Sequence, residues 1–155
     1  MLDLPLNPTP LSDHLVATSG LSTELLTEQQ MPNFARVMLE EDASAPQLAY
    51  VGRPSAPNMF RYGTVFGGQL IAAAQMTVIE SLVHMSGAST LSAFRGRGAQ
   101  GVLLRRRLAD ALNTGCHQAS VEVNVTNSVS LRNVERIGFR RRYQERRFSW
   151  SSPEA

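Results

Sequence analysis

The sequence is most informative at Leu91-Ser-Ala-Phe-Arg95-Gly96-Arg97-Gly98-Ala99-Gln100-Gly101-Val-Leu-Leu104, a glycine-rich turn that runs straight into a helical pattern. Backbone N–H groups at the start of a helix lack partners and lie at the positive end of the helix dipole. Glycine permits positive φ and lets a ligand approach the backbone without a Cβ in the way. Arg95 and Arg97 add charge that pairs with phosphate oxygens. The turn predicts a phosphate or pyrophosphate site, although a plain loop-to-helix junction with solvated arginines has the same pattern.

Regular periodicity follows this turn. Apolar residues first recur at helical spacing, then alternate strictly with polar residues, and then recur at helical spacing again. A glycine follows each helical stretch, where a left-handed cap commonly ends a helix. The predicted order is a helix over Ala99–Asn113, a strand over Ala119–Val125, a helix from Asn127 or Ser128 to Gly138, and a final strand over Phe139–Trp150.

Three strands are predicted before the turn. A tight turn at Phe66-Gly-Gly-Gln69 separates the first two, and Glu80-Ser81 separates the second from the third. Gly87 inside the third strand predicts a bulge or a close backbone approach, with a simple kink as an equal alternative. The three strands are Met59–Val65, Leu70–Ile79 and Leu82–Leu91.

This half of the chain resembles the acyl-CoA-binding core of the GNAT superfamily of N-acyltransferases. The superfamily motif is Arg or Gln, two residues, Gly, one residue, and then Gly or Ala, at the start of a helix. Arg95 and Gly98 match it, whereas Gln100 stands where Gly or Ala is usual, with Gly101 directly behind it. A second family signature is Asn-x-x-Ala/Ser followed by a helix that ends in Gly-Phe. Its positions are held by Asn127, Ser130, Gly138 and Phe139.

The resemblance implies an α/β (α+β) fold of the GNAT type, a mixed, mostly antiparallel sheet flanked by helices. It implies a single acyltransferase domain over residues 13–155, and the prolines of residues 1–12 predict a flexible arm before it. Within this domain, residues 13–58 form a helical N-terminal part and residues 59–150 form the acyl-CoA-binding core.

The N-terminal part has fewer signals of its own. The apolar pattern of Ser22–Asp42 predicts two short helices, with a break forced by Pro32. Ala43–Asn58 carries three prolines and reads as a loop. The only candidate for a first strand is His14–Thr18.

The resemblance also implies a reaction, in which acetyl-CoA as cosubstrate acetylates a small amine or a protein amino group directly in a ternary complex. Such a transfer needs a neutral amine and protonation of the leaving thiolate. In many members a residue on the strand before the turn acts as the base, and His84 holds that position here. The alternative role for His84 is that of a structural histidine with a satisfied hydrogen bond. The usual acid, a tyrosine, is replaced by Val134, and Tyr143 is the nearest substitute. The predicted catalytic residues are His84 and Tyr143.

The resemblance places the pyrophosphate on the turn and the pantetheine arm between two strands that diverge, Leu82–Leu91 and Ala119–Val125. Asn127 and Asn133 are candidates for bonding the pantetheine or ordering the loop, and helix capping explains Asn127 equally well. No metal is predicted. The predicted cosubstrate-binding residues are Thr90, Leu91, Arg95, Gly96, Arg97, Gly98, Ala99, Gln100, Gly101, Asn127 and Asn133.

Composition narrows the class of protein. A length of 155 residues fits one domain, and no apolar run is long enough for a transmembrane helix. The N-terminus lacks the basic and apolar regions of a signal peptide. The lone cysteine, Cys116, excludes an internal disulfide and reads as a small packed residue. We therefore expect a cytoplasmic protein that does not enter a membrane.

All 15 basic residues are arginine, and most of them lie in the C-terminal half. A basic half is compatible with nucleic acid, but the net charge is only +2 and Phe139–Phe148 alternates like a strand with one arginine face. A solvated face, or attraction for a polyanionic cofactor such as coenzyme A, explains this better. We expect an amine acceptor as partner and no nucleic acid, and a homodimer is left open.

Two alternatives compete with the acetyltransferase. Val65–Gln75 resembles a segment of the hot-dog-fold acyl-CoA thioesterases, in which a long helix follows a Gly-Gly-Gln. That interpretation leaves both GNAT-like motifs unexplained. The second alternative is a non-catalytic acyl-CoA-binding regulatory domain, which the valine at position 134 favours.

Overall fold

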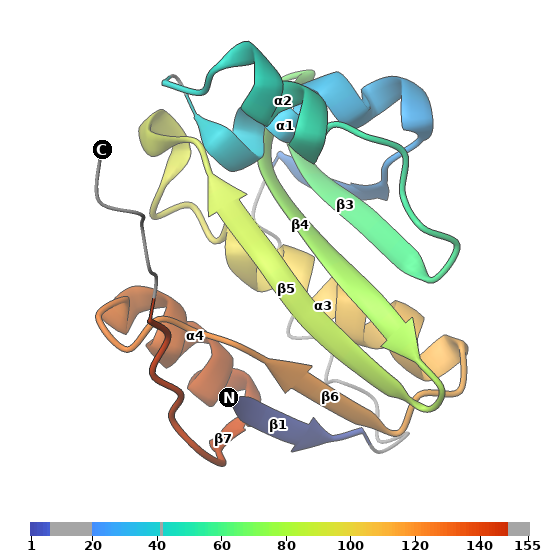
Figure 1. Ribbon diagram of the computed structural model, residues 1–155, viewed down its shortest axis with the longest axis vertical. Coiled ribbons are helices and arrows are strands. Elements are labelled where there is room, and N and C mark those ends of the chain that lie inside the picture. The colour runs from blue at the N-terminus through green and yellow to red at the C-terminus, as the bar shows by residue number, and fades with distance from the viewer. Residues whose placement is uncertain (7–19, 41, 149–155) are drawn as a thin grey trace, which may run out of the picture.

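The centre of the protein is one mixed sheet, seen in a computed structural model that describes residues 1–6, 20–40 and 42–148. The sheet has seven strands in the order β2-β3-β4-β5-β6-β1-β7 (Figure 1). Neighbouring strands are antiparallel except β5 and β6, which are parallel. The elements are β1 (Leu2–Pro5), β2 (Leu21–Leu25), η1 (Glu28–Gln30), α1 (Met31–Leu39), α2 (Ala45–Val51), β3 (Met59–Phe66), β4 (Gln69–Ile79), β5 (Leu82–Thr90), η2 (Ser92–Phe94), α3 (Ala99–Asn113), β6 (Gln118–Val121), α4 (Ser128–Ile137) and β7 (Arg140–Arg141).

Helices cover both faces of the sheet, and alternation along β4 separates the two faces. Ala72 and Ala74 pack into the larger core with α3, whereas Ala73 packs into a smaller core with α1. Figure 1 shows α3 behind the sheet and α1 with α2 in front of it. Leu103 and Leu108 of α3 are fully buried, and each such side chain stabilises the fold by about 1.5–3 kcal/mol.

The predicted core of the fold is confirmed. β3, β4 and β5 each lie within one residue of their predicted bounds, and α3 spans the predicted residues. Asn127 caps α4, because its side chain accepts a hydrogen bond from the Ser130 N–H, and Gly138 ends this helix with a φ of 116°. The strand nature of β4 also contradicts the thioesterase interpretation, which required a helix after Gly67-Gly68-Gln69.

The N-terminal arm predicted over residues 1–12 is wrong where the structure describes it. Leu2–Pro5 is strand β1 and pairs with β6 on one side and β7 on the other. Leu2 is only 3% exposed and belongs to the larger core. Residues 7–12 and the candidate strand His14–Thr18 lie outside the described residues.

The helical prediction for Ser22–Asp42 is partly wrong. Its first residues form strand β2, and only α1 is an α-helix, with Pro32 in its first turn rather than at a break. A first-turn proline costs no hydrogen bond, which is why the helix tolerates it. The loop predicted over Ala43–Asn58 contains α2, which begins with a capping box of Ser44 and Gln47.

The two C-terminal strands are shorter than predicted. β6 ends at Val121 instead of Val125, because the chain turns away from β5 there. β7 covers only Arg140–Arg141, and Arg142–Phe148 has no regular secondary structure. Within the described residues, every helix is too short or too polar to cross a membrane.

Candidate active site

The site begins where two parallel strands separate. β5 and β6 pair only from Leu82 with Gln118 to Met85 with Val121. Beyond that point β5 continues to Thr90, and Figure 1 shows the two strands diverging. Gly87 and Ala88 are therefore exposed, although β5 is an inner strand of the sheet. The second half of β5 presents backbone on the side where β6 has turned away.

A β-bulge lies in this part of β5. Ala74 of β4 pairs with Ala88 and the next residue, Gln75, pairs with Ser86, so Gly87 has no partner. Gly87 has a φ of 46°, which a residue with a Cβ adopts only with strain. The bulge predicted at Gly87 is thus confirmed.

The glycine turn joins the end of β5 to the start of α3. Gly98 is the N-cap residue with a φ of 82°, and no described side chain caps the helix. The first N–H groups of α3 therefore lack intrahelical partners. A Cβ built on Gly96 would meet no heavy atom within 4 Å, so the turn is open to a ligand. The predicted residues 95–101 form one open helix start, which the short helix η2 (Ser92–Phe94) separates from Thr90.

The two arginines of the turn have different surroundings. Arg95 forms an ion pair of 2.8 Å with Glu40 at the end of α1, and its Nε donates to the Thr90 carbonyl at 3.3 Å. The Arg97 guanidinium instead lies 5.2 Å from the ring centroid of Phe66 and 5.7 Å from that of Phe94. Among described residues, Arg97 forms no ion pair, so it is the turn's more available charge.

Gln100, the departure from the motif, bonds the end of β5. Its Nε2 donates to the Ser89 carbonyl and to the Thr90 hydroxyl, both at 2.9 Å. The longer side chain thus connects the first turn of α3 to β5. The Leu91 N–H is also engaged, because it donates to the Ile71 carbonyl at 2.9 Å.

His84 lies on the sheet face opposite α3. Its neighbours Val83 and Met85 are buried in the larger core, and alternation therefore directs His84 to the other face. His84 Nδ1 lies 2.9 Å from the Ser120 hydroxyl on β6. Ser120 in turn faces Asp3 on β1, whose carboxylate forms an ion pair of 2.7 Å with Arg142. Three neighbouring strands thus place a polar row on this face.

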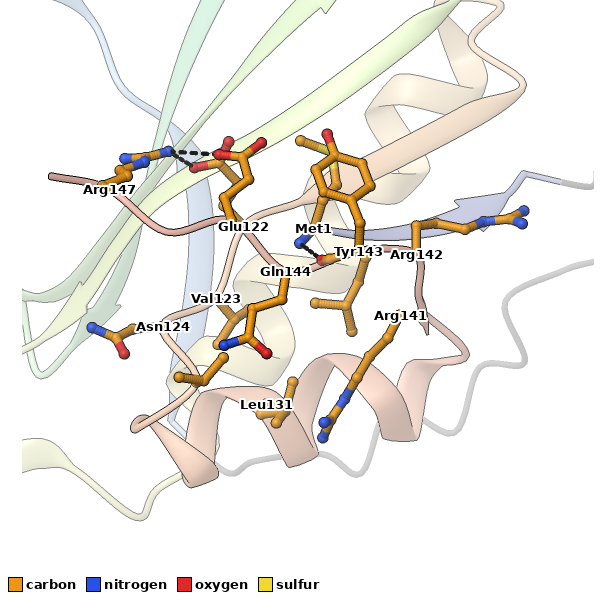
Figure 2. A pocket seen from close by; sticks show the side chains of 13 residues that line it. Met1, Glu122, Val123, Asn124, Leu131, Arg141, Arg142, Tyr143, Gln144 and Arg147 are labelled. Carbon is orange, nitrogen blue, oxygen red and sulfur yellow. Dashed lines mark hydrogen bonds and ion pairs between the residues drawn. The ribbon is translucent and has the colours of Figure 1, made fainter.

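A cavity of about 630 Å³ lies beyond the end of β6. Figure 2 shows the Tyr143 ring on one side of it, and the Gln144 side chain beside Val123 and toward Leu131 on the other. The Tyr143 hydroxyl donates to the Met1 sulfur at 3.5 Å. The lining residues are Met1, Leu2, Glu122, Val123, Asn124, Val125, Leu131, Arg141, Arg142, Tyr143, Gln144, Glu145 and Arg147.

Comparison with solved structures finds this architecture among N-acetyltransferases. An aminoglycoside acetyltransferase from an uncultured soil metagenomic sample, in complex with sisomicin, has a TM-score of 0.71 and 11% identity, over 88% of this chain and 99% of that chain. Aminoglycoside N-acetyltransferase AAC(6')-Iy in complex with CoA has a TM-score of 0.69 and 15% identity, over 84% and 94%. A putative acetyltransferase from the GNAT family of Novosphingobium aromaticivorans has a TM-score of 0.66 and 24% identity, over 91% and 59%.

The chain has the GNAT fold. The predicted fold class, a mixed and mostly antiparallel sheet with flanking helices, is confirmed. No family model matches the sequence, and no curated protein matches it either.

Within the GNAT fold, the predicted site residues fall into separate places. The turn residues and Thr90 lie together, whereas Tyr143 lines the cavity and His84 does not. Asn127 caps α4, and Asn133 is half-buried in the same helix. Val134 is 6% exposed and belongs to the larger core, so its position on α4 faces inward.

Sequence reasoning missed Glu122, a carboxylate at the cavity. It is the first residue after β6 ends, and Arg147 forms an ion pair with it and lies 3.9 Å from Glu145 (Figure 2). Glu122 occupies a polar position of an alternating strand pattern, and a charged residue at such a position ordinarily belongs to the solvent-exposed face. The sequence signal that could have identified Glu122 is its position on the strand Ala119–Val125, which is predicted to diverge from Leu82–Leu91. Among the described residues, no group of three His, Cys, Asp or Glu side chains is arranged to hold a metal ion.

Proposed function

We propose that the protein is an acetyl-CoA-dependent N-acetyltransferase. The observation that carries the proposal is the exposed, bulged half of β5, which leads through η2 and the glycine turn to the uncapped start of α3. An extended thioester arm with an anionic pyrophosphate needs both parts, a free strand edge and a cluster of unpaired N–H groups. A neighbour of the same fold is in complex with CoA, which supports acetyl-CoA as the cosubstrate.

In this proposal the pyrophosphate binds the N–H groups of Arg97 to Gly101, and Arg97 adds charge. The pantetheine arm lies along Gly87–Thr90, with Asn127 and Asn133 on the α4 side. Gln100 already occupies the Ser89 carbonyl, so the arm takes other backbone groups of β5. Acetyl-CoA supplies the activated acetyl group, and the chain's own residues position it.

The proposed chemistry is direct attack of a neutral amine on the thioester carbonyl. Holding the two reactants together supplies much of the rate without a covalent enzyme intermediate. His84 is the proposed base, with Ser120 fixing its ring, and it acts through water because it does not line the cavity, whereas Tyr143, which does, is the proposed acid for the leaving thiolate. A thiol has an ordinary pKa of about 8.5, so the thiolate is a tolerable leaving group.

The proposed acceptor is a small molecule with an amino group, which enters the cavity beside Glu122. The cavity volume of about 630 Å³ lies in the range of small-molecule sites. The soil-sample neighbour is in complex with sisomicin, an aminoglycoside ligand, which supports a small-molecule amine. A peptide amine is the second candidate, because the exposed residues 142–145 line the cavity and offer backbone outside any helix or strand beside it.

The test is CoA release from acetyl-CoA in the presence of a panel of small amines and N-terminal peptides. We expect slow, amine-dependent release, because no tyrosine stands at position 134 and Tyr143, which replaces it from another element, supplies only part of the about 10²–10⁴-fold that a well-placed general acid contributes. Gly98→Val is the control, since valine resists the positive φ of the N-cap and calorimetry should show loss of acetyl-CoA binding. Tight acetyl-CoA binding without release would indicate a regulatory domain. Amine-independent hydrolysis would indicate a thioesterase.

A further inference from the structure

Two arginines, Arg61 of β3 and Arg107 of α3, are buried without an acidic partner among the described residues, and Arg107 is the one beside the β-bulge. Arg107 of α3 is 4% exposed, and it forms no ion pair with a described carboxylate. Burial lowers the pKa of its guanidinium to about 10. A buried cation costs free energy, so its hydrogen bonds must offset that cost.

The hydrogen bonds of Arg107 lead to the β-bulge. Its Nη1 donates to the Gln75 carbonyl at 2.8 Å, and its Nε donates to the Leu103 carbonyl of its own helix at 3.4 Å. Gln75 is the residue of β4 at which the pairing with β5 shifts. The side chain of Gln75 also donates from Nε2 to the Ser86 hydroxyl at 3.4 Å, directly before Gly87.

A bulge disrupts the ladder of hydrogen bonds beside it, and buried carbonyl groups there need another donor. Arg107 supplies such a donor from the helix behind the sheet. On the opposite side of the bulge lie Gly87 and Ala88, the exposed backbone of the diverging strand. Gln75 of β4 thus connects the Arg107 guanidinium to the exposed segment Gly87–Ala88 of β5.

We infer that Arg107 is a positioning residue for the cosubstrate, which holds the β4–β5 bulge in the shape that presents Gly87–Ala88 to the pantetheine arm. The inference rests on the proposed function, because it assigns the arm to this strand. It separates two parts of the binding site. Arg107 affects binding of the pantetheine arm, whereas the glycine turn binds the phosphates independently of Arg107.

The experiment compares two ligands by calorimetry, coenzyme A and 3′-phosphoadenosine 5′-diphosphate, which is coenzyme A without its pantetheine arm. Arg107→Met removes the donors but keeps the bulk, and an unmade hydrogen bond at the bulge should weaken CoA binding by about tenfold. The affinity for 3′-phosphoadenosine 5′-diphosphate should stay within about twofold. Arg107→Lys keeps the charge and a donor and should recover most of the CoA affinity. Arg136→Met, on the exposed side of α4, removes the same charge and should affect neither ligand.

Equal weakening of both ligands in Arg107→Met, or unchanged CoA affinity, would overturn the inference and leave the proposed function intact. Failure of the unmodified protein to bind either ligand would overturn both. If Arg107→Met does not fold, Gly87→Ala tests the same bulge from the other strand, because alanine resists the φ of 46° and would lie 3.0 Å from the Met38 side chain. It should weaken CoA alone, and any other result contradicts the inference.

Discussion

At the scale of single residues, the environment of His84 makes its role measurable. Its ring lies 2.9 Å from the buried Ser120 hydroxyl on the sheet face opposite α3, which suits both a base and a structural histidine. If His84 is the base, His84→Ala should lower turnover by about 10²-fold or more and remove the ascending limb of the rate against pH. Acetyl-CoA affinity should not change.

The measurement is the pH dependence of CoA release at saturating amine, with Ser120→Ala as the matched control. Ser120→Ala removes the orienting hydroxyl but leaves the imidazole, so it should reduce turnover less and keep the limb. Full activity and an unchanged profile in His84→Ala would assign the histidine a structural role. The base would then be water or another group, such as Glu122 at the cavity.

At the scale of elements, the unexpected strand β1 bears on stability. It fills the sheet between β6 and β7, and Leu2 is buried against the larger core. Leu2→Ala should cost about 2–5 kcal/mol of unfolding free energy, because it removes buried methyl groups and leaves a cavity. Denaturant unfolding measures this change. Leu25→Ala on the edge strand β2, where leucine is 46% exposed, should cost far less.

The same elements explain which parts of the fold the sequence predicts. α3, α4 and β3–β5 are long, periodic and bounded by glycine or capping residues, so local chemistry defines them. β1 is four residues long, and its partner for Leu2 is Val121, far along the chain, so only a tertiary contact creates it. α2 had a local signal, the capping box of Ser44 and Gln47, which the neighbouring prolines obscured.

The candidate site divides in the same way. The glycine turn and the bulge at Gly87 follow from residue type, since positive φ selects glycine. The cavity does not, because it joins the N-terminus, the end of β6 and the segment after β7. Glu122, Glu40 and Arg107 act through partners on other elements, and no local pattern indicates such pairs.

At the scale of the whole molecule, charge and fold point to one anionic ligand. All 15 basic residues are arginine, and the net charge of +2 is too small for a general polyanion-binding surface. Ion pairs occupy Arg95, Arg106, Arg141, Arg142 and Arg147. Ten arginines form no ion pair within the described residues, and Arg97 is the one of them that lies on the turn, so attraction for a phosphate at the turn depends most on Arg97.

The affinity for CoA should accordingly fall several-fold as ionic strength rises. The Debye length shrinks from about 10 Å at 0.1 M salt to about 3 Å at 1 M, so solvent-exposed charge–phosphate attraction is screened. Calorimetric titration of CoA over that range gives the slope of affinity against salt. Arg97→Gln should weaken binding at low salt and flatten this slope, whereas Arg140→Gln on the exposed strand β7 should leave it almost unchanged. If both variants flatten the slope equally, the attraction comes from the basic half as a whole and not from the turn.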